Sequence, residues 1–589
     1  MPLIDTARFL PGPVSRACYR PIQPLVEHAF GFREVEHRYQ ALPERGRTAA
    51  EFVRIALREL EISWELSSAD KTALAAIDGP LVLCVNHPCG PVEPLALMDL
   101  LQEIRPDNWR VMANRILATI LELKDSLIPV EPLHPGERDR NGANGFAGAL
   151  KHLRRGDALL TFPAGRVSGR TRELGTVCDR PWSDHPLRLA RIAGASVVCL
   201  HVEGRASRLF LTIPNRWSSL RALLLAREIT HPHCRRLKLR LAGVWDREEA
   251  EALARGPHPS QRLRAHCYLA ADRALADPAP PPSVPTEDSG NHQPTGNTDR
   301  LKKEVARLRE SGLEMFARGP YAVLLFRGDE SRALLEEIGR RREITFQAAG
   351  QGTGREIDLS EEDDYYHHLI LWDREEDFLA GAYRLGFEEE IRAERGAEAL
   401  YLQPLFRFHK TFYRRISPGA ELSRSFVIPA RQRDGRALAC LWKGLTAAAA
   451  QRNCRTYYGC VTISNLFHPA SRAILVDFLD RHYSDDAALR RLVHPVHPFH
   501  PETHYHRLVT EAFAGEKIDA LRPVIEEIEN GHRSIPPLIR YYCSVGARYL
   551  AFHVEPSFGN AIYCLLRVDL NEIGERHQRH FQSLNLPTT

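Results

Sequence analysis

The sequence predicts two domains of different class: an α/β domain in the first half and an α+β domain in the second. The chain has 589 residues, which is too long for one compact core. Residues 277–299 are rich in Pro, Ser, Gly and Asn and almost free of large apolar side chains, so they read as a disordered linker. The predicted division is therefore a domain at 1–276, a linker at 277–299 and a domain at 300–589.

The first half alternates short apolar runs with helical patterns, an order typical of a largely parallel central sheet. The runs expected to form strands are 81–85, 158–162, 196–202, 210–213 and 237–241. The expected helices are 94–101, 147–153 and 187–192.

The second half has a different arrangement of elements. Its expected strands are 368–372, 378–383, 425–428, 457–463 and 561–568. Helical runs follow Arg436, Ala470 and Pro536. This pattern indicates α+β or mixed α/β, and the two halves show no repeat of one another.

The composition is that of a globular protein, with 43% hydrophobic and 26% charged residues. No run of about eighteen apolar residues occurs, so we expect no transmembrane helix. The start of the chain lacks the charged-then-apolar layout of a secretory signal, which favours the cytosol. The 12 cysteines form no CxxC pair. We therefore expect reduced thiols and no zinc site.

The net charge of +4 hides a basic segment at 151–240, where 18 Lys and Arg stand against 6 Asp and Glu, a balance of +12. Such a segment fits an anionic lipid surface, an acidic protein or nucleic acid, or is simply a solvated basic face. Nucleic acid is disfavoured because the segment has no recognisable motif and no aromatic residues for stacking between its arginines.

A candidate catalytic pair follows the first strand, in the segment Asn-His-Pro-Cys-Gly-Pro-Val-Glu at 86–93. His87 lies in a turn at the end of a buried strand, where α/β sheets bind ligands. Glu93 follows six residues later, so the turn can bring its carboxylate to the imidazole. Such a pair (an HX5E motif) can take a proton from an attacking hydroxyl. The alternative is a capping His87 with a Glu93 that only favours a helix N-terminus.

A second turn, Phe-Pro-Ala-Gly-Arg-Val-Ser at 162–168, also directly follows a strand. Gly165 permits close backbone approach, and Arg166 and Ser168 offer donors for an anionic group.

These two segments, with Ala-Asn-Arg at 113–115 and Val-Glu-Gly-Arg at 202–205, resemble the four blocks of the glycerolipid acyltransferase family in their order. More closely, they are similar to its bacterial branch linked to ornithine-lipid synthesis, often labelled as hemolysins. The resemblance covers 81–244. It implies acyl transfer from acyl carrier protein or acyl-CoA to a lyso-lipid hydroxyl, with His87 as general base and Glu93 as its orienting carboxylate.

The resemblance also implies which residues line the acceptor site. They are Asn86, Gly90, Asn114, Arg115, Phe162, Pro163, Gly165, Arg166, Ser168, Glu203 and Arg205.

Two departures from the family bear on the substrate. The branch usually has Asp where Glu93 stands. Phospholipid-type members carry Glu in place of Ala164 and Arg in place of Val167. This is compatible with an aminolipid acceptor rather than a glycerol phosphate.

In the second half, Glu-Leu-Ser-Arg-Ser-Phe-Val at 421–427 lies on a predicted strand. Alternation would place Glu421, Ser423 and Ser425 on one face. The alternative is the exposed face of an antiparallel sheet.

With Asp-Asp-Tyr-Tyr-His-His-Leu-Ile-Leu-Trp-Asp at 363–373 and the segment at 378–386, this strand resembles the acyl-homoserine-lactone synthases and the ornithine N-acyltransferases. Both have GNAT-like folds that use acyl carrier protein thioesters. Ile-Pro-Pro-Leu-Ile-Arg-Tyr-Tyr at 535–542 matches the ornithine-type branch better. The coverage is 313–570.

The second resemblance implies that Asp364, Ser423 and Arg424 lie at the site for an amino acid and an acyl thioester. Glu421 would accept the proton of the attacking amine, and Arg424 would pair with a carboxylate of substrate or protein. The Gly-rich pyrophosphate loop of coenzyme-A-using members is not evident, which favours acyl carrier protein as donor.

The histidine-rich segment 494–506 offers five imidazoles, so metal binding is an alternative there. Its spacing is that of a Pro-rich loop, and we expect no metal and no tightly bound cofactor.

Together the halves resemble a bifunctional aminolipid synthase. The second domain would N-acylate an amino acid, commonly ornithine, with a (3-hydroxy)acyl thioester, and the first would O-acylate the hydroxyl of the lyso-aminolipid formed. The expected partners are acyl carrier protein and the anionic inner face of the cytoplasmic membrane, with no nucleic acid. One alternative is a lyso-phospholipid acyltransferase whose second half only binds carrier protein. A membrane-lytic protein is disfavoured because no segment is long enough to insert.

Overall fold

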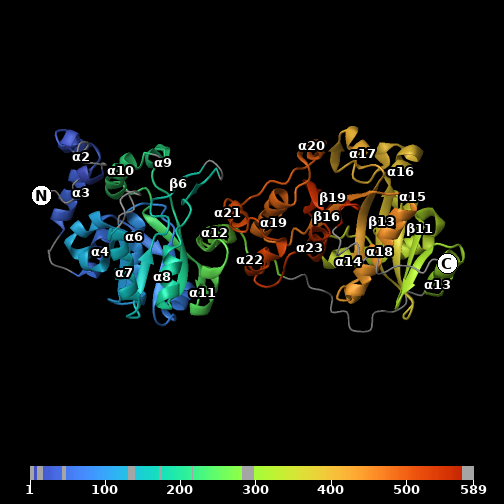
Figure 1. The fold of residues 1–589 in the computed structure, drawn as a ribbon, viewed down its shortest axis with the longest axis horizontal. Helices are drawn as coiled ribbons and strands as arrows, with labels where there is room; N and C mark the ends of the chain where they lie inside the picture. The colour runs from blue at the N-terminus through green and yellow to red at the C-terminus, as the bar shows by residue number, and fades with distance from the viewer. Residues whose placement is uncertain are drawn as a thin grey trace. The chain divides into compact units, whose positions relative to one another are not determined.

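The computed structural model describes residues 6–9, 17–42, 48–130, 140–171, 175–214, 217–280 and 298–573. The chain divides into two compact units. Unit 1 comprises Met1–Leu275 with Thr503–Phe513, and unit 2 comprises Ala276–Glu502 with Ala514–Thr589. Figure 1 shows each unit as a sheet with helices packed against it. Most of the predicted linker, 281–297, lies outside the described residues.

Unit 1 is built on a seven-stranded sheet of order β1-β9-β8-β2-β5-β3-β4. Its strands are β1 Ser63–Glu65, β2 Leu81–Val85, β3 Trp109–Asn114, β4 Leu127–Val130, β5 Ala158–Thr161, β8 Ser196–Glu203 and β9 Arg236–Trp245, with a separate pair β6 Gly169–Arg170 and β7 Val177–Cys178. Neighbours pair in parallel except for β8 with β9. The prediction of a largely parallel sheet is confirmed, with β9 and β1 running opposite to the other five strands.

The expected strand at 210–213 is wrong, because the chain there forms the short helix α9. The hydroxyl of Ser207 accepts a hydrogen bond from the backbone N–H of Phe210 and caps this helix. Phe210 and Leu211 are buried although they are not in a strand. A short apolar run cannot by itself distinguish a buried helix turn from a strand.

Unit 1 also contains helices, some of which lie against its sheet and some against other helices. They are α2 Gln23–Ala29, α3 Phe32–Ala41, α4 Ala49–Glu59, α5 Ser68–Ala75, α6 Val92–Ile104, α7 Arg140–Leu153, α8 His185–Ala193, α9 Arg208–Thr212, α10 Ser218–Thr230, α11 Arg247–Arg255, α12 Pro259–Arg273 and α21 His506–Ala512, with 3-10 turns η1 Thr6–Phe9, η2 Arg115–Thr119 and η3 Leu121–Ser126. Leu81, Leu83 and Val85 of β2 pack with α4 and α6 in one core cluster. Helices α8 and α12 contact the sheet as well, and their buried side chains lie outside that cluster. Successive side chains of β2 point to opposite faces of the sheet, so β2 has helices packed on both of its faces.

One piece of unit 1 comes from the second half of the sequence. Thr503–Phe513, which contains α21, belongs to unit 1 and packs on α12. The buried carboxylate of Asp272 accepts hydrogen bonds from the backbone N–H groups of His504 (3.0 Å) and Tyr505 (2.9 Å). The domain division predicted from sequence instead assigned this segment to the second domain, at 300–589.

Unit 2 is built on an eight-stranded sheet of order β10-β11-β12-β13-β15-β16-β19-β18. Its strands are β10 Glu314–Arg318, β11 Tyr321–Arg327, β12 His367–Asp373, β13 Phe378–Phe387, β15 Gly419–Val427, β16 Thr456–Ile463, β18 Arg548–Glu555 and β19 Ala561–Asp569, with a separate pair β14 Phe406–Phe408 and β17 Val493–Pro495. All neighbours in the large sheet pair antiparallel except β15 and β16, which are parallel. The five strands expected in this half are all present.

The remaining elements of unit 2 are mostly helices. They are α13 Thr298–Glu310, α14 Arg332–Ala348, α15 Glu362–Tyr365, α16 Glu388–Arg395, α17 Thr411–Ile416, α18 Gly435–Gln451, α19 Pro469–His482, α20 Ala487–Arg490, α22 Arg522–Ile528 and α23 Pro537–Ser544, with η4 Gly328–Glu330, η5 Ala397–Ala399, η6 Pro429–Arg431, η7 Ile518–Leu521 and η8 Pro556–Phe558. One core cluster joins α13 and α14 to β11, β12 and β13, and a second gathers around β16 to β19. In the described parts of both units, every helix is too short or too polar to span a bilayer.

Candidate active sites

The four sequence blocks of the first half lie at the carboxyl ends of β2, β3, β5 and β8. Because these strands are parallel neighbours in the sheet, their ends share one edge. Asn86 joins two of them. Its side-chain amide donates to the carbonyl of Val202 (3.0 Å), and its side-chain oxygen accepts from the N–H of the same residue (2.7 Å). Asn86 is buried, so its side chain fixes the sheet edge.

The predicted pair of His87 and Glu93 is brought together. Nδ1 of His87 lies 2.6 Å from Oε1 of Glu93. Glu93 stands in the first turn of α6, where the helix N-terminus favours a carboxylate, and Oε1 also accepts from the N–H of Cys89 (3.2 Å). Gly90 makes the turn between them with φ +78°, a conformation that side chains rarely adopt.

This geometry leaves the other imidazole nitrogen of His87 for a substrate. The side chain of Glu93 is 0% exposed and that of His87 is 18% exposed, so the ring is the accessible member of the pair. A carboxylate on Nδ1 fixes the tautomer that keeps Nε2 unprotonated. The ring of Phe162 packs against the imidazole with 4.5 Å between centroids. The pair can therefore deprotonate a hydroxyl that reaches Nε2.

A buried carboxylate that sequence reasoning missed holds this turn in place. Oδ1 of Asp179 accepts from the backbone N–H of His87 (3.2 Å) and from the hydroxyl of Ser168 (2.5 Å). Oδ2 accepts from the indole N–H of Trp182 (2.8 Å). The N–H of Ser168 in turn donates to the carbonyl of His87 (2.8 Å). Ser168 thus connects two loops, and its hydroxyl is engaged by Asp179.

Arginines gather beside the same loops. Burial, followed by the charge of Arg180, lowers the pKa of Arg166. Burial, followed by the charges of Arg180 and Arg166, lowers the pKa of Arg221 to about 10. Arg221 donates to the carbonyl of Ser168 (2.8 Å). Cations that depress one another's pKa attract an anionic ligand. Arg221 comes from α10, more than fifty residues after the Ser168 loop, so no local pattern reveals it.

Three other residues predicted to line the first site stand at its strand ends. Asn114 ends β3, and Arg115 follows it at the start of η2. Gly165 has φ +63° and donates its N–H to the carbonyl of Phe162 (2.9 Å), which closes the turn after β5.

The three remaining residues predicted for this site make contacts within the protein itself. They are Pro163, Glu203 and Arg205. The carbonyl of Pro163 accepts from the N–H of Ser183 (3.1 Å). Glu203 is exposed and forms an ion pair with Arg240 of β9 (3.0 Å). Arg205 is also exposed, and its backbone groups bond the thiol of a cysteine described below.

In unit 2, the parallel strands β15 and β16 separate part of the way along. Their pairing runs from Gly419 with Thr456 to Leu422 with Gly459, and both strands continue beyond it. On its other side β15 shifts register against β13 at this level, and Arg424 has φ +50°. Strained backbone of this kind concentrates at functional sites.

Glu421 lies at the end of the paired region, opposite Tyr458 of β16. Its carboxyl is 0% exposed, and within the described residues neither oxygen makes a hydrogen bond of normal geometry. Burial raises its pKa to about 8. Arg384, the backbone of Leu402 and the hydroxyl of Tyr366 lie near enough to oppose that rise. A buried carboxyl that titrates near neutral pH is suited to proton transfer.

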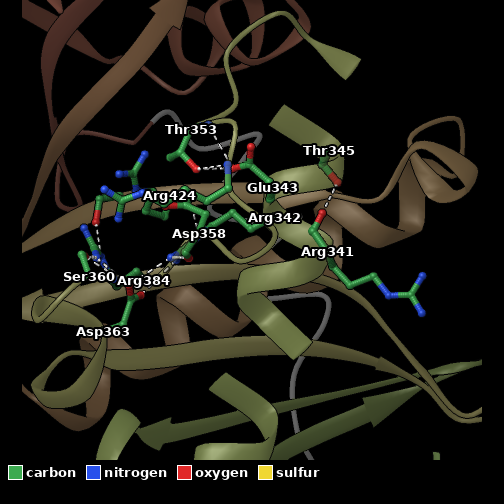
Figure 2. A network of polar contacts seen from close by, with 12 residues as sticks. Arg341, Arg342, Glu343, Thr345, Thr353, Asp358, Ser360, Asp363, Arg384 and Arg424 are labelled. Carbon is green, nitrogen blue, oxygen red and sulfur yellow. Dashed lines mark hydrogen bonds and ion pairs between the residues drawn. The ribbon is translucent and has the colours of Figure 1, made fainter. Parts of the chain in front are cut away.

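Arg384, whose charge acts on Glu421, belongs to a network of charged side chains. Figure 2 shows Arg342, Asp358, Asp363 and Arg384 of this network gathered together. Asp363 accepts from two guanidinium nitrogens of Arg342 (3.0 Å each) and lies 3.3 Å from Arg384. Arg342 also pairs with Asp358 (2.8 Å). Although burial opposes it, the positive charges of Arg384 and Arg342 hold the pKa of Asp363 below its usual range.

The predicted residues of the second half meet this network in different ways. Asp364 is 56% exposed and faces Arg332 (3.5 Å), whereas the neighbouring Asp363 is the buried one. The hydroxyl of Ser423 accepts from Nε of Arg384 (3.0 Å), so it orients that guanidinium.

Arg424 lies beside the network. Its guanidinium stacks over Tyr401 (5.4 Å) and Phe558 (5.2 Å), with Nε 3.7 Å from Asp358. Its side chain is 13% exposed. Arg424 is thus a cation close to the point where β15 leaves β16.

The histidine-rich segment is held by structural contacts. The N–H of His497 donates to Nδ1 of His553 (3.1 Å), and Nδ1 of His506 is hydrogen-bonded to the hydroxyl of Thr503 (2.9 Å). In the part of the chain that the structure describes, no group of three or more His, Cys, Asp or Glu residues is arranged to hold a metal.

Comparison with known proteins assigns a class to each half. Residues 6–229 match the family described as "Acyltransferase", and residues 341–443 match the "Acetyltransferase (GNAT) domain". The glycine N(alpha)-acyltransferase of Phocaeicola vulgatus is 30% identical over 270 residues, which cover 43% of this chain and 82% of that protein. The glycine N(alpha)-acyltransferase of Bacteroides thetaiotaomicron is 30% identical over 298 residues, covering 48% and 87%.

Among solved structures, the acyl-homoserine-lactone synthase LasI aligns with a TM-score of 0.24 and 12% identity, over 46% of this chain and 98% of that one. The two family matches confirm the expected acyltransferase region in the first half and the GNAT-like region in the second.

Proposed function

Because this chain is an acyltransferase and belongs to the family of the glycine N(alpha)-acyltransferases, we propose that it makes an aminolipid by two acyl transfers. The unit 2 site N-acylates the α-amino group of an amino acid, and the unit 1 site O-acylates the hydroxyl of the resulting lyso-aminolipid. The acyl donors are thioesters, with acyl carrier protein as the carrier at the second site. The amino acid is glycine, as in the names of the relatives, or ornithine, as the sequence resemblance suggests.

The observation that carries the O-acylation is the His87–Glu93 pair. In the proposed step Nε2 of His87 takes the hydroxyl proton as the lipid oxygen attacks the thioester carbonyl. The new C–O bond forms, the C–S bond breaks, and the departing thiolate receives the proton from the imidazolium. Glu93 stabilises the transient positive charge on the ring. No covalent enzyme intermediate is needed.

The acceptor proposed for this site fits the arginines beside it. N-acylation removes the positive charge of the α-amino group and leaves the α-carboxylate. The head group then presents a carboxylate alone when the amino acid is glycine, and a carboxylate beside a side-chain ammonium when it is ornithine. Arg166 and Arg221 offer the charge-assisted hydrogen bonds that such a carboxylate prefers. Ala164 and Val167 stand where phospholipid-type members of the family carry Glu and Arg. These differences favour an aminolipid over a glycerol phosphate acceptor.

The N-acylation is supported by Glu421 and the separation of β15 from β16. An extended thioester arm can bond the backbone groups that the two strands do not offer to each other beyond Leu422 and Gly459. The amine attacks the thioester carbonyl, so that the C–N bond forms and the C–S bond breaks. Glu421 in its ionised form accepts the ammonium proton and can pass it to the departing thiolate, which leaves as the thiol. In this proposal Arg424, a cation beside the strand separation, pairs with the substrate carboxylate.

Access to lipid is proposed at one end of unit 1. Helices α2, α3 and α10 pack together, and Phe210 of α9 lies in a shared cluster with Leu224 of α10. Apolar side chains remain exposed there, with Leu25 72% and Trp217 51% exposed. Trp217 lies in the basic segment, and exposed apolar residues near such a segment suit the surface of an anionic membrane, where each cation contributes on the order of 1 kcal/mol. We propose peripheral binding through this face.

The test is lipid mass spectrometry of a host without aminolipids that expresses the full chain with either amino acid supplied. Wild type is expected to give the diacylated aminolipid, His87→Ala to accumulate the N-acylated lyso-lipid, and Glu421→Gln to give neither. If wild type changes only phospholipid acyl composition, the proposal is wrong for both sites. If Glu421→Gln still makes N-acylated amino acid, the assignment of Glu421 as the proton acceptor is wrong.

A further inference from the structure

Two cysteines meet at the His87 turn. Cys89 stands two residues after His87, is 3% exposed, and donates its backbone N–H to the carboxylate that orients the imidazole. Cys234 precedes β9 and is partly exposed. Its sulfur accepts from the N–H of Arg205 (3.2 Å) and bonds the carbonyl of the same residue (3.0 Å). The mechanism uses neither thiol.

The sulfurs converge on Gly204. A Cβ atom at this glycine would lie 2.5 Å from Sγ of Cys89 and 3.2 Å from Sγ of Cys234. The two thiols therefore lie where the side chain of any other residue at position 204 would be. They are hydrogen-bonded to each other. The backbone of Arg205 holds Cys234 in place through two hydrogen bonds.

The two thiols differ in acidity. The hydrogen bond from Cys89, followed by the backbone of Arg205, lowers the pKa of Cys234 to about 7 against the opposing effect of burial. The hydrogen bond and burial raise the pKa of Cys89 well above its ordinary value. A partly exposed thiolate next to a buried thiol is the arrangement of an attacking and a resolving cysteine.

We propose that Cys89 and Cys234 form a reversible disulfide that switches off the unit 1 site, an inference that rests on the proposed O-acyl transfer at His87. The oxidant is a hydroperoxide such as hydrogen peroxide. The Cys234 thiolate attacks its O–O bond, giving a sulfenic acid and, after protonation, one water. The Cys89 thiol then displaces the sulfenic hydroxyl, giving the disulfide and a second water. Two thiols lose two electrons and two protons, and the peroxide is reduced to two waters.

The proposed disulfide affects the His87 site through Cys89. A disulfide draws its sulfurs closer together than a hydrogen bond holds them. In the proposed disulfide Cys89 is pulled toward Cys234, which displaces the backbone N–H that Cys89 donates to Glu93. Since misplacement of a catalytic group by about 1 Å costs up to roughly a hundredfold in rate, the His87 site loses activity. Reduction by a dithiol restores the turn.

The experiment uses the full-length protein, with its activity in the reduced state measured first. Hydrogen peroxide treatment is followed by alkylation of free thiols, proteolysis and mass spectrometry, and by assays of both acyl transfers. We expect a linked pair of peptides containing residues 89 and 234, at least about a tenfold loss of O-acylation, and recovery with dithiothreitol. Cys234→Ser is expected to keep basal activity and resist peroxide, whereas the control Cys18→Ser at an exposed cysteine behaves as wild type.

Three outcomes overturn the inference: no linked peptide, a linked peptide with unchanged O-acylation, or inactivation of Cys234→Ser as fast as wild type. If Cys234→Ser does not fold, the peptide map and activity of wild type decide alone. The N-acyl transfer rate in the same samples reports general oxidative damage. A reduced wild type that lacks O-acylation refutes the proposed function instead, and the peptide map then still shows whether the disulfide forms.

Discussion

Nδ1 of His87 and Oε1 of Glu93 are 2.6 Å apart, with the carboxylate wholly buried and the ring partly accessible. The branch that the first half resembles in sequence usually has Asp at this position. Here Glu93 stands in the first turn of α6 and reaches back across the turn made by Gly90. The longer side chain is therefore matched to this backbone.

We predict that Glu93→Gln lowers the rate of O-acylation by about a hundredfold or more, because the amide no longer stabilises the imidazolium that forms in the transition state. Glu93→Asp is expected to fall between Gln and wild type, since one methylene fewer lengthens the contact with Nδ1. The measurement is kcat with a lyso-aminolipid at saturating thioester. Equal rates for Glu93→Gln and wild type would leave Glu93 with a capping role only.

The arginines beside Ser168 are predicted to act on acceptor binding. Arg166→Ala is expected to raise KM for the lyso-aminolipid about tenfold with a small change in kcat, because a charge-assisted hydrogen bond contributes about 1.5–3 kcal/mol and Arg166 is only partly buried. Arg191→Ala, at an exposed arginine of α8 in the same unit, is the matched control. A neutral methyl-ester analogue of the acceptor should lose the difference between the two variants. If the difference in KM persists with the methyl ester, Arg166 does not bind the charged group of the acceptor.

The pH dependence of N-acylation follows from Glu421. Its pKa of about 8 means that the carboxyl is mostly protonated below pH 8 and ionised above it. Only the ionised form accepts a proton, so kcat/KM for the amino acid is expected to rise with pH through about 8. The substrate amine adds its own dependence at higher pH. Glu421→Gln should lose the step near 8 and keep the limb due to the amine. A wild-type profile without that step would contradict the assignment.

The raised pKa of Glu421 also makes the stability of unit 2 depend on pH. The folded pKa of Glu421 lies above the ordinary value of 4.5, so the buried neutral carboxyl contributes stability that is fully present below pH 4.5. This contribution is lost as pH rises from about 4.5 through about 8. Glu421→Gln should make the unfolding temperature of unit 2 less dependent on pH in that window.

The first site could be predicted from sequence where its parts are local. His87, Gly90 and Glu93 lie within one turn after a strand, and the strand and helix that carry them follow from apolar periodicity. Asp179 and Arg221 could not be found in this way, because they reach the turn from distant loops and helices. Asp179 is one of six acidic residues in the basic segment 151–240, and no local pattern separates it from the other five.

The second unit shows the same limit. The strands with clear β-branched or aromatic runs were predicted, whereas β11 at Tyr321–Arg327 is an uninterrupted apolar run whose period is ambiguous. The network of Asp363, Arg342 and Arg384 depends on three elements that meet only in the fold. Choosing between Asp363 and Asp364 needs the backbone direction, which adjacent residues of the same type do not reveal.

Tyr505 provides the last prediction, since it links the second half of the chain to the first site. Its ring packs on Tyr268 (4.8 Å between centroids), and the hydroxyl of Tyr268 accepts from the N–H of Asp179 (2.7 Å). Asp179 in turn bonds the backbone of His87. Tyr505→Ala is predicted to destabilise unit 1 by about 2–4 kcal/mol through lost packing. It should also lower kcat for O-acylation about tenfold at temperatures where the unit stays folded, because Asp179 is less firmly placed.

Control variants distinguish the loss of Tyr505 ring packing from a change in the position of Asp179 and His87. Tyr505→Phe retains the ring and loses only hydroxyl contacts, a long hydrogen bond to the carbonyl of Val177 (3.4 Å) and one with the side chain of Thr176, so it should behave nearly as wild type. Asp272→Asn loosens the same segment from the other side, because a buried carboxylate that accepts two N–H groups is replaced by a side chain that accepts at one oxygen only. It should also lower O-acylation while N-acylation persists. His504→Ala removes an exposed ring, keeps the N–H that Asp272 accepts, and serves as the neutral comparison. A truncated chain that ends before residue 300 lacks this segment. If it O-acylates at the full rate, Thr503–Phe513 has no part in positioning His87.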